Sequence, residues 1–247
     1  METDRFSKDR VFVLGALTAI TVVGWAYLYW DAQTMNCARW MSAGTLWNLP
    51  GFLAVFSMWS IMMVAMMAPS VAPMAMTFAL VNRRRKEHSA PYVPVAIFLL
   101  GYLIVWTVFS VLATTAQFWL TSVRILSMSM ASTSPIFAGG LLIGAGLFQW
   151  TPWKQRCLTF CAGPLQFLLT EWREGWGGAL RMGLRHGLFC LGCCWAVMAL
   201  LFVAGVMNLL WVGALSLFVL AEKLAPKYVS RPSGGVLIAS GVWLLFA

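Results

Sequence analysis

No charged side chain interrupts residues 51–81, which read GFLAVFSMWSIMMVAMMAPSVAPMAMTFALV. About 20 apolar residues are enough for a helix to cross the hydrocarbon core of a bilayer. Working outward, the chain contains further apolar runs, and the expected spans are Val11–Trp30, Gly51–Val81, Val93–Leu120, Pro135–Trp150, Gly183–Ala204, Leu209–Ala221 and Gly234–Ala247. The pattern predicts an all-α polytopic transmembrane bundle with six to seven spans, forming a single integral membrane domain over residues 1–247.

The last span is expected to be short. As a helix it reaches only about 21 Å, at 1.5 Å per residue, whereas the bilayer core is about 30 Å thick. The Gly-rich fourth span, with Gly139, Gly140, Gly144 and Gly146, predicts close helix packing.

Composition and charge narrow the class of protein. Of the 247 residues, 61% are hydrophobic and 10% charged, against about 25% charged in soluble domains. This excludes a soluble enzyme, a nucleic-acid binder and a disordered chain. When the spans alternate in direction, 15 of the 17 basic residues fall on one side. The positive-inside rule makes that side cytoplasmic, and the N-terminus lies on it. We therefore expect a multi-pass protein of the bacterial inner membrane, surrounded by the lipid bilayer.

Asp, Glu, Lys and Arg are absent from the spans away from their ends, which disfavours a proton-coupled pump. Of the two histidines, His88 is expected to be solvated in the basic loop, which leaves only His186 and excludes a bis-His haem within one chain; no nucleophile–base–acid set can be assembled either. We therefore expect no enzymatic activity.

Sulfur is the remaining chemistry. Seven methionines fall within residues 58–76, among them Met62, Met66 and Met67. At 100° per residue they form two helical faces, and Pro69 is expected to kink the helix and expose carbonyls. Thioether and thiolate sulfur favour Cu(I), so this segment is either a soft-metal path or a flexible core filling.

The fifth span carries the sharpest pattern. His186, Cys190 and Cys194 are spaced i, i+4, i+8, so they follow one helical stripe, and Cys193 lies beside Cys190. Three cysteines within five residues indicate a metal or redox site more readily than buried small hydrophobes.

A second thiol pair, Cys157 and Cys161, lies in the segment 151–182, which we expect to be a loop on the cytoplasmic side. Nearby Lys154 and Arg156 are expected to lower the pKa of these thiols. Five of the six cysteines fall in the cytoplasmic half, where thiols stay reduced; Cys37 stands alone in the outer loop.

Outside the sulfur groups, Asn208 is expected to form a turn. Glu222 is either a hard metal ligand or the partner of a local ion pair with Lys223, and we favour the ion pair, although snorkelling to the interface also explains Lys223.

Several segments resemble a bacterial family of unknown function described as predicted metal-binding integral membrane proteins. The resemblance covers about residues 55–225. The matching motifs are Met62-Met63-x-Ala65-Met66-Met67-x-Pro69-Ser70, Gln149-x-Thr151-Pro152-x-Lys154-x-x-Cys157-Leu158-x-x-Cys161, Cys190-Leu191-Gly192-Cys193-Cys194-Trp195, Gly205-x-Met207-Asn208-x-x-Trp211 and Glu222-Lys223. It implies a membrane bundle that binds a metal.

Three functions remain open. The first is a protein that binds or passes a soft metal, Cu(I) before Zn, through these Met, Cys and His residues, with Cys157 and Cys161 as docking thiols for a metal-donor protein or membrane complex. No ATP-binding motif occurs, so transfer would be passive. The second is a thiol-redox protein in which Cys157 and Cys161 exchange disulfides with Cys190, Cys193 and Cys194. The third is a non-catalytic membrane subunit.

Overall fold

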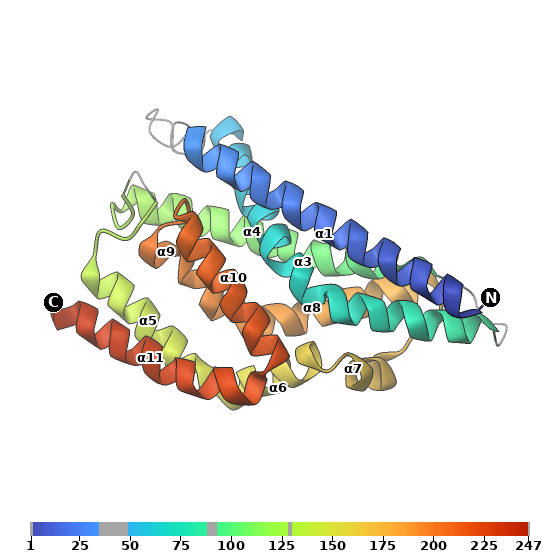
Figure 1. Ribbon diagram of the computed structural model, residues 1–247. Coiled ribbons are helices and arrows are strands. Elements are labelled where there is room, and N and C mark those ends of the chain that lie inside the picture. Colours follow the sequence, from blue (N-terminus) through green and yellow to red (C-terminus); the bar gives the residue numbers. More distant parts are fainter. Residues whose placement is uncertain (1, 35–48, 88–92, 128–129, 247) are drawn as a thin grey trace.

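The computed structural model describes residues 2–34, 49–87, 93–127 and 130–246, and these form an all-α bundle (Figure 1). Cys37 and His88 lie outside the described residues. In chain order the helices are α1 (Glu2–Thr34), α3 (Leu49–Glu87), α4 (Val95–Ser122), α5 (Pro135–Gln149), α6 (Pro152–Ala162), α7 (Pro164–Glu171), α8 (Gly175–Ala199), α9 (Leu201–Ala204), α10 (Leu209–Leu224) and α11 (Pro226–Phe246).

Five stretches of these helices are long and apolar enough to cross a membrane: Val11–Thr34, Leu49–Arg85, Val95–Ser122, Gly175–Ala204 and Pro226–Phe246. The helices α5 and α10, with 15 and 16 residues, reach about 23 Å each at 1.5 Å per residue. Among the expected spans, these two helices fall short of the bilayer core. Seven crossings therefore remain a prediction, whereas the all-α bundle is confirmed for the described residues, with five helices long and apolar enough to cross a membrane.

Three expectations about segment boundaries were wrong, the first being that of α8, which begins at Gly175 rather than Gly183. The last helix begins at Pro226 rather than Gly234, and its 21 residues extend to about 31 Å. Proline suits a first helical turn because its missing N–H has no partner there anyway. The segment 151–182 is not a loop, since it contains α6 and α7.

Capping side chains start the short helices. Ser134 and Thr151 accept hydrogen bonds from the first turns of α5 and α6, and each is followed by a proline. Asn208 caps α10 by accepting from the N–H of Trp211, which confirms the turn expected there. The helix α6 packs mainly along α8, and its Lys154, Leu158 and Cys161 side chains are buried.

The helices α5 and α11 pack as antiparallel neighbours, whereas α4 and α8 run in parallel, and the N- and C-termini lie at opposite ends of the bundle (Figure 1). Glycine sets the closest approach: a Cβ added to Gly183 of α8 would lie 2.0 Å from the carbonyl oxygen of Phe98 in α4. In α5, Gly139 and Gly146 face α11 at similarly close range, which confirms the packing predicted for this helix, whereas Gly140 and Gly144 face open space.

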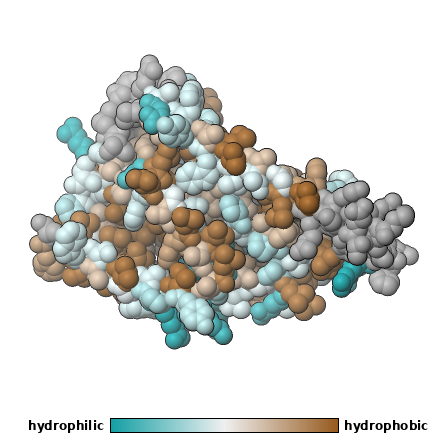
Figure 2. Space-filling view, viewed as in Figure 1, coloured by the Kyte–Doolittle hydropathy of each residue, from teal (hydrophilic) through white to brown (hydrophobic). Residues whose placement is uncertain are grey.

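Hydrophobic side chains cover the outer surface of the bundle. Figure 2 shows them across the middle of one face, with hydrophilic groups toward its margins. Large apolar residues such as Leu112 and Leu169 are well exposed, as expected for helices that contact lipid rather than water.

Candidate functional site

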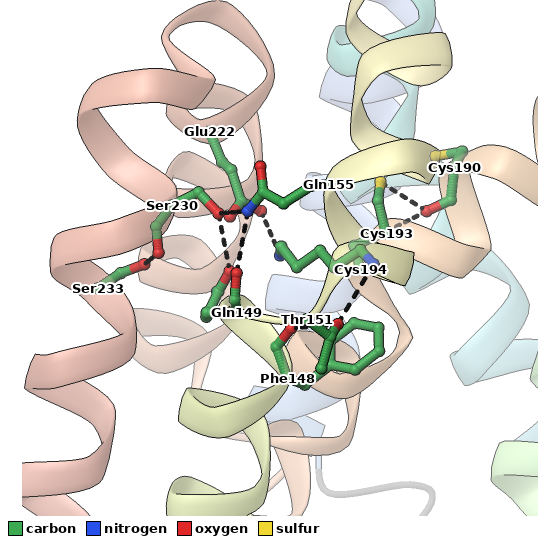
Figure 3. A network of polar contacts seen from close by, with 11 residues as sticks. Phe148, Gln149, Thr151, Gln155, Cys190, Cys193, Cys194, Glu222, Ser230 and Ser233 are labelled. Atoms are coloured by element: carbon green, nitrogen blue, oxygen red, sulfur yellow. Dashed lines mark hydrogen bonds and ion pairs between the residues drawn. The ribbon is translucent and has the colours of Figure 1, made fainter.

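The helix α8 brings three thiols to one buried stripe. Cys190, Cys193 and Cys194 are at most 1% exposed. The Cys193 and Cys194 thiols donate to the backbone carbonyl of Cys190, at 3.1 and 2.7 Å (Figure 3). This follows from the i, i+3 and i+4 spacing, which superimposes these positions along the helix.

The Cys190 thiol contacts two polar side chains from other helices. The Nζ atom of Lys223, near the end of α10, lies 3.0 Å from Cys190 Sγ, and the hydroxyl of Tyr102 in α4 lies 3.2 Å from it. Lys223 also donates to Ser70 Oγ in α3 at 2.8 Å. A neighbouring ammonium favours the thiolate, which is the form of cysteine that binds metals.

The helix α6 contributes a fourth buried thiol to this group. Cys161 is 6% exposed, and its thiol lies near enough to those of Cys190 and Cys193 to interact with them electrostatically. Cys161 is therefore part of the thiol cluster, which we define as Cys161, Cys190, Cys193 and Cys194, and not a docking residue on the surface.

Cys157, one turn earlier in α6, lies apart from the cluster. It is partly exposed and sits against the backbone of α8, because a Cβ built on Gly192 would lie 2.8 Å from its Sγ. The expected fall in its pKa is wrong: burial raises the pKa of the Cys157 thiol, although a hydrogen bond with Trp153 acts in the opposite direction. Lys154 has no such effect because its ammonium is directed elsewhere.

Lys154 forms an ion pair with Glu222 instead. The distance from Lys154 Nζ to Glu222 Oε2 is 2.8 Å, and the two side chains are 0% and 1% exposed. The expected local pair of Glu222 with Lys223 is therefore wrong. Consecutive residues of a helix point about 100° apart, so Glu222 turns toward α6 while Lys223 turns toward α3 and α8.

Polar side chains surround this ion pair (Figure 3). Gln155 donates to Ser230 Oγ at 3.1 Å, and Ser230 donates to Gln149 Oε1 at 3.3 Å. Within the described part of the chain, Glu222 Oε1 has no hydrogen-bond partner. This polar group fastens α6 to α10 and α11 beside the thiol cluster.

The methionines of α3 are buried on both of the predicted faces. Met62, Met66 and Met67 are each 1% exposed. Met67 is the one tied to the cluster by hydrogen bonding, since Ser70 Oγ donates to its carbonyl at 2.9 Å and lies 3.8 Å from its sulfur. Met67 and Tyr102 also line a cavity of about 80 Å³ between α1, α3 and α4.

His186 lies one turn before Cys190 and is 1% exposed. The rings of Phe98, Tyr102 and Phe167 surround it, with centroids at 5.8, 5.8 and 5.2 Å from the imidazole. Its Nδ1 is buried and has no hydrogen-bond partner in the described residues. The stripe predicted from spacing is present, but His186 is enclosed by aromatic rings.

The arrangement gathers soft donors without preforming a metal centre. Among residues 2–34, 49–87, 93–127 and 130–246, no group of three His, Cys, Asp or Glu side chains is placed to hold a metal ion. The thiols instead contact one another, the Cys190 carbonyl and Lys223. Metal binding at this position would require the thiols of Cys193 and Cys194 to rotate away from that carbonyl.

The partners of the cluster were not recognised from the sequence. Ser70 and Lys223 belong to the motifs of the family resemblance, so the sequence marked them, but it did not indicate that Lys223 contacts both Cys190 and Ser70. Tyr102 had no such signal, because nothing in an apolar run distinguishes a tyrosine that faces the core.

Comparison with known proteins matches residues 56–244 to one family model, described as PpoB2: Copper chaperone. No curated protein and no solved structure matches the chain.

Proposed function

Because the chain belongs to the PpoB2 copper chaperone family, we propose that it is a multi-pass membrane protein that binds Cu(I) within its bundle and passes it on. The observation that carries the proposal is the thiol cluster, in which two helices bring four cysteines together around Cys190. Cu(I) is its cargo, and the chain is not an enzyme.

The ligands are assigned by softness and position. Cu(I) prefers thiolate and thioether sulfur and accepts linear or trigonal coordination. The four thiols of the cluster are therefore the primary donors, and Met67 is the adjacent thioether. Met62 and Met66 extend the line of buried sulfur along α3, with His186 as a further donor at the edge of the cluster.

Transfer proceeds by ligand exchange with a copper donor or acceptor. The chain carries no P-loop motif for ATP. Cys157 is the most accessible of the described cysteines and lies one helical turn from Cys161. We assign it the first contact with the partner, on the side where α6 and α7 lie.

Orientation and location follow from charge. The basic residues lie mainly at the ends of the bundle that hold the N-terminus, α6 and α7, and these ends are assigned to the cytoplasm of a bacterial cell by the positive-inside rule. The membrane is then the inner membrane. The thiols near its cytoplasmic side are expected to stay reduced, because the cytoplasm is reducing.

A thiol-redox function is the second candidate, because the Cys161 thiol contacts those of Cys190 and Cys193. By thiol–disulfide exchange, two of these thiols would become a disulfide while the disulfide of a partner is reduced to two thiols. A copper site and a redox pair therefore use the same sulfur atoms but differ in whether copper is retained.

Elemental analysis of the detergent-purified protein after anaerobic Cu(I) loading separates these functions. We expect about one copper per chain in the wild type, its loss in Cys190→Ser/Cys193→Ser/Cys194→Ser, and its retention in the matched control Cys157→Ser. Copper kept by the triple variant would refute the ligand assignment. Absence of copper from the wild type would refute the copper function and leave the redox one.

A further inference from the structure

Lys223 is a buried ammonium that lies beside a thiol rather than a carboxylate. Its Nζ atom is 3.0 Å from Cys190 Sγ and 2.8 Å from Ser70 Oγ, and the residue is 8% exposed. Glu222, its neighbour in sequence, is committed to Lys154. Across the part of the chain that the structure describes, no carboxylate lies within ion-pair distance of Lys223.

A buried ammonium needs a negative partner, because an uncompensated charge in a low-dielectric interior is costly. The groups that act on Lys223 electrostatically are Cys161, Cys190, Cys194 and Tyr102. Thiols bound to a metal are thiolates and carry that negative charge. The geometry therefore supplies an ammonium in direct contact with one of the sulfur atoms that would bind copper, Cys190 Sγ.

We propose that Lys223 is the counter-cation of the metal complex and makes the site selective for a monovalent soft ion. This inference rests on the proposed function. Two thiolates and one Cu(I) leave one negative charge, which Lys223 neutralises. With Zn²⁺ the same two thiolates and Lys223 leave an excess positive charge, which the buried site disfavours.

Lys223 is a positioning residue in this scheme and not a ligand. Loading forms two copper–sulfur bonds while copper stays Cu(I). Any proton displaced from a thiol passes to the donor's freed thiolate or to water. The ammonium then donates to the bound Cys190 sulfur, where charge-assisted hydrogen bonds are strongest.

The test compares two affinities in the same variants: Cu(I) by anaerobic competition with bicinchoninate, and Zn²⁺ by competition with a fluorescent chelator. We expect Lys223→Met to weaken Cu(I) binding by about tenfold or more without weakening Zn²⁺ binding. Lys223→Arg keeps the charge and should keep the Cu(I)-to-Zn²⁺ ratio. Ser70→Ala, the matched control, removes the other partner of Lys223 and should change the ratio by less than about threefold.

Equal loss of both metals in Lys223→Met would show that the lysine only holds the helices together. Unchanged or tighter Cu(I) binding would refute the counter-cation directly. If Lys223→Met does not fold, Lys223→Gln replaces it as a neutral but polar variant, and the ratio of Cu(I) to Zn²⁺ affinity is measured in the same way. A wild type that binds no Cu(I) refutes the proposed function itself, whereas the outcomes above require a wild type that does bind it.

Discussion

Removing the Lys154 charge is expected to destabilise the bundle far more than a typical substitution. The ion pair with Glu222 spans 2.8 Å, and both side chains are inaccessible. Lys154→Met leaves Glu222 as a buried carboxylate that has lost its partner at Oε2, while Oε1 has none to begin with among the described residues. Breaking a buried pair on one side costs about 3–5 kcal/mol. Coulomb's law gives about 6 kcal/mol for unit charges at this distance, with an effective dielectric constant of 20.

The double variant Lys154→Met/Glu222→Leu supplies the control. It removes both charges, and replacement of a whole buried pair by apolar groups is often neutral or stabilising. Thermal and SDS-induced unfolding in detergent should therefore place the double variant within about 1 kcal/mol of the wild type, and the single variant several kcal/mol below it. A single variant as stable as the wild type, or a double variant as unstable as the single one, would refute the reasoning.

Three further outcomes are expected. Gly183→Ala should lower the unfolding temperature, because its Cβ would meet the Phe98 carbonyl, whereas Gly177→Ala in the same helix meets nothing within 4 Å and should not; equal effects in thermal unfolding would contradict the close contact. Cys161→Ser should lose copper, whereas Cys157→Ser should keep it but transfer it more slowly to a small thiol acceptor. The absorbance of a chromophoric copper chelate follows the transfer, and identical behaviour of the two variants would contradict the separate roles assigned to these cysteines of α6. Since burial raises the Cys157 pKa, its alkylation rate, measured by peptide mass spectrometry, should still be rising with pH above the ordinary thiol value of 9.0; a plateau at lower pH would contradict the burial.

Much of the helical bundle could be predicted from local pattern. The uncharged run at 51–81 lies within α3, and Pro135 marks the start of α5 as predicted. The boundary of α11 was missed because Lys227 and Arg231 made its first turns look like a loop. A helix can contain such basic residues near the end of the bundle, because their long side chains extend the charged group toward water.

The stripe of cysteines in α8 could be predicted because it depends on helical periodicity alone. The contacts of Cys190 could not, because Tyr102, Ser70 and Lys223 come from three other helices whose order in the bundle is not written in any local pattern. The pairing of Glu222 was misjudged for a similar reason. Adjacent opposite charges suggest a pair in sequence, but on a helix they diverge toward different neighbours.

The glycines of α5 carry a consequence for how the chain can vary. Positions 139 and 146 touch α11, so every side chain larger than hydrogen collides there, while 140 and 144 open outward. A saturation library read out by folded yield should therefore show intolerance at the first two positions and broad acceptance at the other two. Four glycines of one short helix thus differ sharply in the substitutions that their surroundings allow.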